Sequence, residues 1–181
     1  MNKTQSNCLI LFTEHYIDIW QNTTKHAPIS SELYGVPSPC IIDTIDLAVL
    51  WLPIRPSPHS LAIAEEVANI RIHDSAHLFY GTQYAGDMQA QWHDLSLSLI
   101  QVWSDDDFSR LEQNIIAHLM MQKKLKRRPT IFIATTNDEA EIIAIDNKTG
   151  NIILEKLITN ETKVLASDLD TFLSNLTPIA Q

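Results

Sequence analysis

Residues 94–128 read DLSLSLIQVWSDDDFSRLEQNIIAHLMMQKKLKRR, and the spacing of apolar residues changes once within this stretch. Leucine alternates with serine from Leu95 to Leu99, which is the pattern of a β-strand with one buried and one solvent-exposed face. Beyond Ser104 the apolar residues recur every three or four positions, beginning at Phe108. This second spacing predicts an amphipathic helix. A strand followed directly by a long helix is therefore the first structural prediction.

The charges of this predicted helix are ordered as the helix dipole favours. Ser104 can cap the N-terminus, because its hydroxyl can accept a hydrogen bond from a free backbone N–H. Asp105–Asp107 follow in the first turn, and five basic residues lie within Lys123–Arg128 at the other end. Acidic groups at the start and basic groups at the end of a helix each contribute ~0.3–1 kcal/mol. Pro129 is expected to end the helix.

The chain before this stretch is expected to begin with a helix and to continue through short elements. Residues 4–22 carry large apolar side chains at helical spacing, namely Leu9, Phe12, Tyr16, Ile19 and Trp20. The proline-rich stretch that follows predicts an extended crossing. Short strands are then predicted at 40–42, 48–52, 70–72 and 78–80. Residues 61–70 predict a helix or a turn, and Asp74 and Ser75 predict a turn between the last two strands. Residues 84–88 predict a loop with Gly86 as its hinge.

The chain after the long helix is expected to form three strands and a closing helix. Residues 130–135 predict a strand in the middle of the sheet. Residues 141–145 and 152–157 predict a hairpin, and Ser167 is expected to cap a last helix that Pro178 ends. Helices and strands do not alternate regularly. The sequence therefore predicts a single α+β domain over residues 1–181, with a mostly antiparallel, twisted sheet flanked by helices.

The net charge of the chain is −9, and its basic residues are concentrated in one place. Residues 1–122 contain fourteen acidic and five basic side chains, whereas residues 123–128 contain five basic and no acidic ones. Nucleic-acid binding requires a larger surface of clustered cations, so this composition argues against it. A basic protein partner would explain the acidity, and so would solubility alone.

The two cysteines, Cys8 and Cys40, form neither a metal-ligand spacing nor a disulfide framework, so reduced thiols are expected. The N-terminal residues lack the long apolar core of a signal peptide. No apolar run approaches the ~20 residues of a membrane span. We expect a soluble, cytosolic protein, with any membrane contact peripheral.

Signals for catalysis or metal binding are weak in this sequence. It has no G-x-S-x-G, H-E-x-x-H, P-loop or G-x-G-x-x-G motif. His73 and His77 could bind zinc from one helix face, but the local pattern indicates strand and turn. His118 is expected to be a boundary residue of the long helix, and a pairing of Cys40 with a distant histidine has no local support. We predict no catalytic residue, no metal site and no cofactor.

The main candidates for binding are acidic residues that helix capping and the helix dipole do not explain. They lie in loops or at strand ends, and they are Glu32, Asp43, Asp46, Asp87 and Asp94. Asp105–Asp107 add a cluster that capping explains only in part. Gathered on one face, these groups would form a negative concave surface that attracts a basic loop. Tyr34 and Tyr84 are expected to be exposed and able to contact cations, whereas Trp103 is expected in the core.

Four strings of this sequence are distinctive, namely SELYGVPSPCII (31–42), FYGTQYAGDMQAQW (79–92), LIQVWSDDDFSRLEQNIIAHLMMQKKLKRRPTIFIAT (99–135) and LASDLDTFLSNL (165–176). Together they resemble the Syd family of SecY-interacting proteins. The resemblance covers nearly the whole chain in order, and LYGVPSPC and AGDM are unusual strings. It implies an α+β fold related to the SUKH superfamily, with an acidic concave groove.

The resemblance also implies a function and a location. Members of this family associate with the SecY subunit of the bacterial translocation channel, as peripheral proteins on the cytoplasmic side of the inner membrane. Their proposed role is to monitor or release improperly assembled SecY complexes, and no enzymatic activity is implied. By position in the matching strings, the groove is expected at Glu32, Tyr34, Asp87 and Asp105–Asp107, with Asp43 and Asp94 as further candidates. Cytosolic loops of membrane proteins are rich in Lys and Arg, which an acidic groove would complement.

Two other functions fit the same residues. An enzyme, either hydrolase-like or modifying a small molecule, would use Asp87 with a nearby histidine in a deep pocket. An immunity-type protein would share the fold and the acidic face but would bind a toxin. The cations of Lys123–Arg128 also have two readings, because they could contact anionic lipid or only complement the end of the helix.

Overall fold

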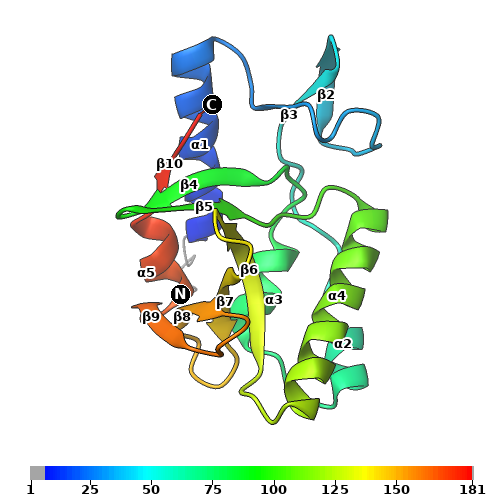
Figure 1. Ribbon diagram of the computed structural model, residues 1–181. Coiled ribbons are helices and arrows are strands. Elements are labelled where there is room, and N and C mark those ends of the chain that lie inside the picture. Colours follow the sequence, from blue (N-terminus) through cyan, green and yellow to red (C-terminus); the bar gives the residue numbers. More distant parts are fainter. Residues whose placement is uncertain (1–6, 181) are drawn as a thin grey trace, which may run out of the picture.

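The computed structural model describes residues 7–180, which form five helices and ten strands in two sheets (Figure 1). The main sheet has seven strands in the order β10-β4-β5-β6-β7-β8-β9, each antiparallel to its neighbour, and a smaller sheet has the order β1-β3-β2. The architecture is therefore α+β and mostly antiparallel, as predicted. In chain order the elements are α1 (Cys8–Thr24), β1 (Ile29–Ser30), β2 (Ile41–Ile45), β3 (Ala48–Trp51), α2 (Ala62–Ala68), α3 (Asp74–Gly81), β4 (Met88–Trp92), β5 (Leu95–Leu99), α4 (Asp105–Lys124), β6 (Thr130–Thr136), β7 (Glu141–Asp146), β8 (Ile152–Lys156), β9 (Thr162–Ala166), α5 (Leu169–Ser174) and β10 (Thr177–Pro178).

Helices lie on both sides of the main sheet. Figure 1 shows α4 and α2 together on one side, with α1 and α5 on the other. The small sheet stands beside the C-terminal half of α1, on the same side as the start of α4 (Figure 1). This arrangement leaves the loops around the small sheet facing the N-terminus of α4.

The strand and the helix of residues 94–128 form as predicted. β5 buries Leu97 and Leu99 on one face. Ser104 caps α4, because its Oγ accepts a hydrogen bond of 3.2 Å from the Asp107 backbone N–H. The helix buries the apolar face that the spacing predicts, with Phe108, Leu111, Ile115 and Leu119. It ends at Lys124, so the last three basic residues follow the helix instead of belonging to its final turn.

The C-terminal part also follows the predicted order. β6 is the fourth of the seven strands and is central, as expected. β7 and β8 form the predicted hairpin, and its turn requires Gly150, which has φ +76° and lies where a Cβ would be 2.6 Å from the His73 ring. The cap of α5 is Asp168 and not the predicted Ser167, because the Asp168 carboxylate accepts a 2.7 Å hydrogen bond from the Thr171 N–H.

The first helix is confirmed with shifted ends. Asn7 caps α1 through a 3.0 Å bond from the Leu9 N–H, and predicted positions 4–6 lie outside the described residues. The helix extends two residues beyond the predicted end and buries most of the expected face, namely Leu9, Phe12, Tyr16 and Trp20. The helical alternative for residues 61–70 is confirmed by α2.

The strand predicted at 70–72 is wrong, because residues 70–73 belong to no strand or helix. The turn predicted at Asp74 and Ser75 and the strand predicted at 78–80 are also wrong, because the chain forms α3 from Asp74 to Gly81. The His73 ring caps this helix by accepting a 3.2 Å bond from the Ser75 N–H. Ala76, Phe79 and Tyr80 are then buried at helical spacing. Four strands were not predicted: β4, which begins inside the segment expected to be a loop, β9, and the two-residue strands β1 and β10.

Candidate functional site

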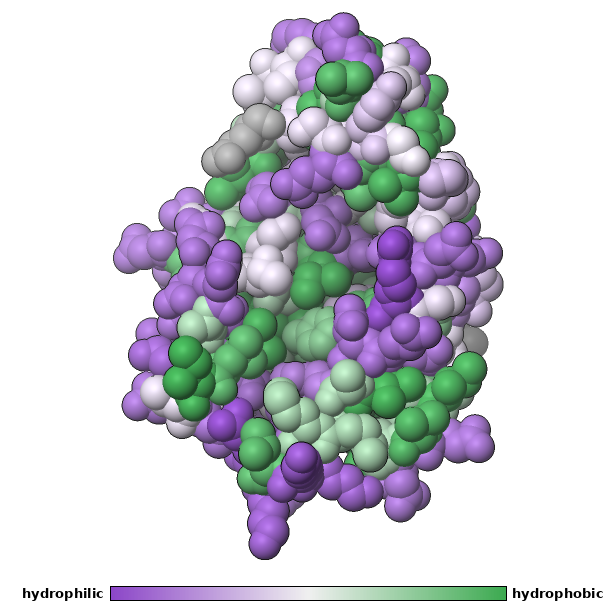
Figure 2. Space-filling model, turned by 45° about the vertical axis from the view of Figure 1, so that its right-hand side comes forward, coloured by the Kyte–Doolittle hydropathy of each residue, from purple (hydrophilic) through white to green (hydrophobic). Residues whose placement is uncertain are grey.

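A groove of about 680 Å³ opens where the small sheet faces the start of α4. Its walls come from α1, residues 29–36, β3, residues 85–89, the end of β5 and the first turns of α4. Figure 2 shows a hollow near the middle of this side of the molecule, with hydrophilic residues around it. We call this feature the groove.

Aromatic rings form a large part of the groove wall. Tyr16 stacks on Trp51 with ring centroids 6.2 Å apart, and Trp103 meets Trp51 edge-on at 6.4 Å. The backbone at residue 86 packs directly against Trp51, and this position requires glycine because a Cβ there would lie 2.8 Å from ring atoms of Trp51. Tyr16, Trp51 and Trp103 are only 2–3% exposed, so the rings form an apolar floor of the groove, which suits the alkyl chain of a lysine or arginine.

Asp87 lies in this groove directly after Gly86. Its Oδ1 accepts a 2.8 Å hydrogen bond from the Gln101 backbone N–H, which fixes the carboxylate across the β4–β5 hairpin. The side chain is reached by water from the open side, but protein crowds it on the others. This partial desolvation is the main reason that the pKa of Asp87 rises to about 6, and the negative charges of Asp107 and Glu32 add to the rise. Those two charges are thus near enough to act on Asp87.

Asp107 also lines the groove, and it is held by the start of α4. Its Oδ2 accepts a 2.8 Å bond from the Trp103 N–H while its own N–H donates to Ser104 Oγ, a reciprocal arrangement similar to a capping box. Arg110 lies one turn later, with its guanidinium 3.7 Å from Asp107. Glu32 completes the acidic set from the loop after β1. Among the described residues, three carboxylates and one arginine line the groove.

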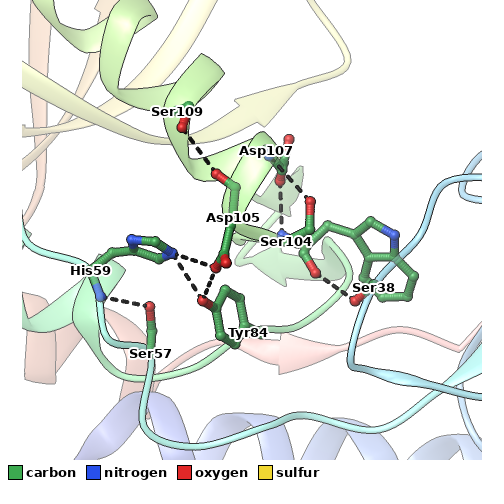
Figure 3. A network of polar contacts seen from close by, with 9 residues as sticks. Ser38, Ser57, His59, Tyr84, Ser104, Asp105, Asp107 and Ser109 are labelled. Carbon is green, nitrogen blue, oxygen red and sulfur yellow. Dashed lines mark hydrogen bonds and ion pairs between the residues drawn. The ribbon is translucent and has the colours of Figure 1, made fainter.

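Asp105 has different partners, although it is two residues from Asp107. Figure 3 shows its carboxylate meeting Tyr84 and His59. The Tyr84 hydroxyl donates to Asp105 Oδ1 at 2.5 Å, and His59 Nε2 lies 3.0 Å from the same oxygen and 2.9 Å from the hydroxyl. These contacts, that of Tyr84 first, lower the pKa of Asp105, while burial and the adjacent carboxylate raise the pKa of Tyr84 to about 12. The His59 ring stacks on Phe108 at 4.1 Å, so this network ties the loop before α2 to α4.

The structure therefore brings together only part of the predicted acidic set. Glu32, Asp87 and Asp107 line the groove, whereas Tyr34, Asp43, Asp94, Asp105 and Asp106 are not among the residues described as lining it. Tyr34 is exposed, as expected, in the turn before Gly35. Asp43 lies on β2 and accepts a 2.7 Å bond from the Thr44 N–H. Asp94 borders a separate depression beside Lys163 of β9, and Asp106 is exposed on the first turn of α4.

Comparison with known proteins identifies the family. The family model for Syd protein (SUKH-2) matches residues 6–178. The chain belongs to the Syd family. It is 44% identical over 176 residues to a protein named Protein Syd from Pectobacterium carotovorum subsp. carotovorum, which covers 96% of each chain. It is 46% identical over 181 residues to Protein Syd from Yersinia enterocolitica and 45% identical over 180 residues to that from Yersinia pestis, in each case covering 99% of this chain and 98% of the relative.

In this Syd-family chain, several residues of the site were not predicted from the sequence. Arg110 could have been found, because it stands three positions after Asp107 on a helix, where opposite charges meet. Gln101 holds Asp87 through its backbone, which leaves no signal in the side-chain pattern. His59 lies between the segments predicted at 48–52 and 61–70, where the sequence predicts no site residue. Tyr84 is predicted to be exposed but is 6% exposed, and its hydroxyl contacts Asp105 and His59.

The histidines and cysteines considered as candidates in the sequence do not form a reactive centre in the described part of the Syd-family fold. His73 caps α3, and His77 lies 3.0 Å from Glu65. Within residues 7–180, no group of three His, Cys, Asp or Glu side chains is arranged to hold a metal ion. Burial raises the pKa of the Cys40 thiol, which is the opposite of what a nucleophile needs. No histidine is among the described residues that line the groove beside Asp87.

No helix within residues 7–180 combines the length and the apolar character needed to cross a bilayer.

Proposed function

We propose that this Syd-family chain is a non-catalytic protein that binds basic cytoplasmic loops of SecY through the groove. It would act from a peripheral position on the cytoplasmic side of the inner membrane, where it would monitor or release improperly assembled SecY complexes. The observation that carries the proposal is the gathering of Glu32, Asp87 and Asp107 beside an aromatic wall, from three separate parts of the chain. Membership of the Syd family supports the choice of partner.

The chemistry of the groove suits a lysine or arginine side chain. Carboxylates can accept from the cationic end, while the apolar floor made by the rings suits the alkyl stem. Partial desolvation raises the pKa of Asp87, and the negative charges of Asp107 and Glu32 raise it further. A bound cation would remove this repulsion. Arg110 beside Asp107 shows how a guanidinium can meet the same group.

Binding should be measured first with SecY complexes in nanodiscs, against empty nanodiscs, across a salt series. We expect binding that requires SecY and weakens by at least tenfold between about 50 and 500 mM salt, because the Debye length falls from roughly 13 to 4 Å. Equal binding to both kinds of disc, or SecY binding that salt does not change, would contradict the groove as the site of recognition.

The pH dependence of SecY binding should follow Asp87. A basic loop binds the ionised carboxylate, so affinity should fall as pH drops through the pKa of about 6. If only the ionised form binds, the apparent affinity at about pH 5.5 is roughly fourfold lower than at pH 7.5. Asp87→Asn can keep an acceptor for the Gln101 N–H but cannot ionise, so it should bind more weakly at pH 7.5 and lose this dependence.

The matched control for this pH series is Asp43→Asn, which removes one carboxylate from β2, outside the residues that line the groove. It should keep the wild-type pH profile. An Asp87→Asn profile as steep as that of wild type would show that another group controls the dependence.

A further inference from the structure

The segment at the far end of α4 exposes cations and apolar side chains together. Lys123, Lys124 and Lys126 are exposed, and none of them has an ion-pair partner within the described residues. Large apolar side chains lie among them in sequence, with Met120 44%, Met121 45% and Leu125 51% exposed. Complementing the helix dipole requires cations only, so it does not explain these exposed apolar groups.

This segment is held firmly against the rest of the fold. The Arg127 N–H donates to the Gln122 carbonyl at 2.8 Å, and the Arg127 guanidinium donates to the Leu157 carbonyl at 3.1 Å. Arg128 forms an ion pair with Asp146 of β7. The two arginine side chains are therefore used in contacts within the protein, whereas the three lysines remain available to a partner.

The neighbouring helix extends the apolar part of this surface. α2 packs beside α4, and it exposes Ile63 (58%) and Val67 (52%), which are one turn apart. Figure 2 shows hydrophobic side chains gathered over the lower part of the molecule, next to strongly hydrophilic groups at its base. Glu66 of α2 is exposed as well, so this surface has an acidic member, but the three lysines outweigh it.

We propose that this surface, made by Lys123, Lys124 and Lys126 with Met120, Met121 and Leu125, docks directly on anionic lipid headgroups. Cations attract such a membrane, and exposed aliphatic and thioether side chains can enter the boundary between headgroups and acyl chains. A nucleic acid would use the lysines but would offer nothing to the apolar groups. The remainder of the chain has a net negative charge, so its overall charge does not favour an anionic surface, whereas this segment does.

This surface lies at the opposite end of α4 from the groove, and the lipid-binding proposal does not depend on the proposed role of the groove. Asp107 and Arg110 line the groove from the first turns of α4, and the lysines lie at its other end. A helix of 20 residues is roughly 30 Å long at 1.5 Å per residue. Docking by the lysine end would hold the acidic groove away from the headgroups, which would otherwise repel it.

The test uses the full chain and protein-free vesicles, one set of phosphatidylcholine alone and one with about 30% phosphatidylglycerol. Flotation should show at least tenfold tighter binding to the anionic vesicles, given the usual contribution of each lysine near such a surface. Lys123→Gln/Lys124→Gln/Lys126→Gln should lose most of this binding. The matched control, Lys148→Gln/Lys156→Gln/Lys163→Gln, removes the same charge from exposed positions elsewhere and should bind as wild type.

The apolar contribution has its own matched pair. Leu125→Gln should weaken vesicle binding at least threefold, whereas Ile158→Gln, at a side chain 81% exposed near the β8–β9 turn, should not. Equal binding to both vesicle types, or equal loss in both lysine triples, would overturn the proposal. So would single-stranded RNA binding as tight as vesicle binding and unaffected by Leu125→Gln, because the partner would then be a polyanion without an apolar phase.

Discussion

The double variant Glu32→Lys/Asp87→Lys is expected to bind SecY complexes at least a hundredfold more weakly than the wild-type chain. It turns two of the three groove carboxylates into cations, so the groove would repel a basic loop instead of attracting it. Like charges placed together at an interface cost several kcal/mol, and about 2.7 kcal/mol already corresponds to a hundredfold. Binding to SecY in nanodiscs at about 150 mM salt measures the effect.

The control for this variant must change the net charge equally without changing the groove. Asp43→Lys/Asp94→Lys does so, since Asp43 lies on β2 and Asp94 borders a different depression. It should bind within about threefold of wild type, because neither residue lines the groove and exposed charges are screened at this salt concentration. An equal loss in both double variants would assign recognition to the overall charge, and unchanged binding of the groove variant would refute the groove.

Folding of the groove variant needs a separate check, because Asp87 also holds the Gln101 N–H. Losing that hydrogen bond should lower stability by about 1 kcal/mol, which thermal melting would show. Asp87→Asn with Glu32→Gln can keep the acceptor and removes charge without reversing it. This milder pair should fold as wild type and still bind more weakly, which separates recognition from stability.

Asp105–Asp107 show what sequence could and could not predict about the site. In the sequence they form one acidic cluster at a helix N-terminus. In the structure Asp105 joins Tyr84 and His59, and Asp106 is exposed. Asp107 accepts a hydrogen bond from the Trp103 N–H and lines the groove. Reversing all three charges would therefore disturb the fold together with any binding. Their separate roles depend on His59 and Tyr84, whose positions no local pattern determines.

The fold, like the site, is predictable from the sequence only in part. β5 and α4 were predictable because each has a long, regular spacing of apolar residues and α4 has a clear cap. β4 was missed although Met88 and Ala90 alternate with glutamines and are buried, a period-two signal hidden by the neighbouring glycine. α3 was missed because it is short and its cap is a histidine, which is an uncommon N-cap residue. Glu32 and Asp87 meet only through the assembled fold.

Replacing Gln122 by leucine is expected to destabilise the chain by about 2–4 kcal/mol, the largest effect that we predict for a single substitution. Gln122 is 1% exposed on α4 and bonds three groups at once. Its Oε1 accepts from the Thr130 N–H at 2.9 Å, and its Nε2 donates to Thr130 Oγ1 at 2.8 Å and to Glu155 at 3.4 Å. Leucine would leave a buried N–H without an acceptor and remove a donor from a buried carboxylate.

The contrast with Gln113→Leu makes this prediction specific. Gln113 lies on the same helix but is exposed, so its replacement should change stability by less than about 0.5 kcal/mol. In urea unfolding, Gln122→Leu should lower the midpoint by about 1 M or more relative to Gln113→Leu. Equal midpoints would mean that the Thr130 N–H and Glu155 are satisfied without Gln122.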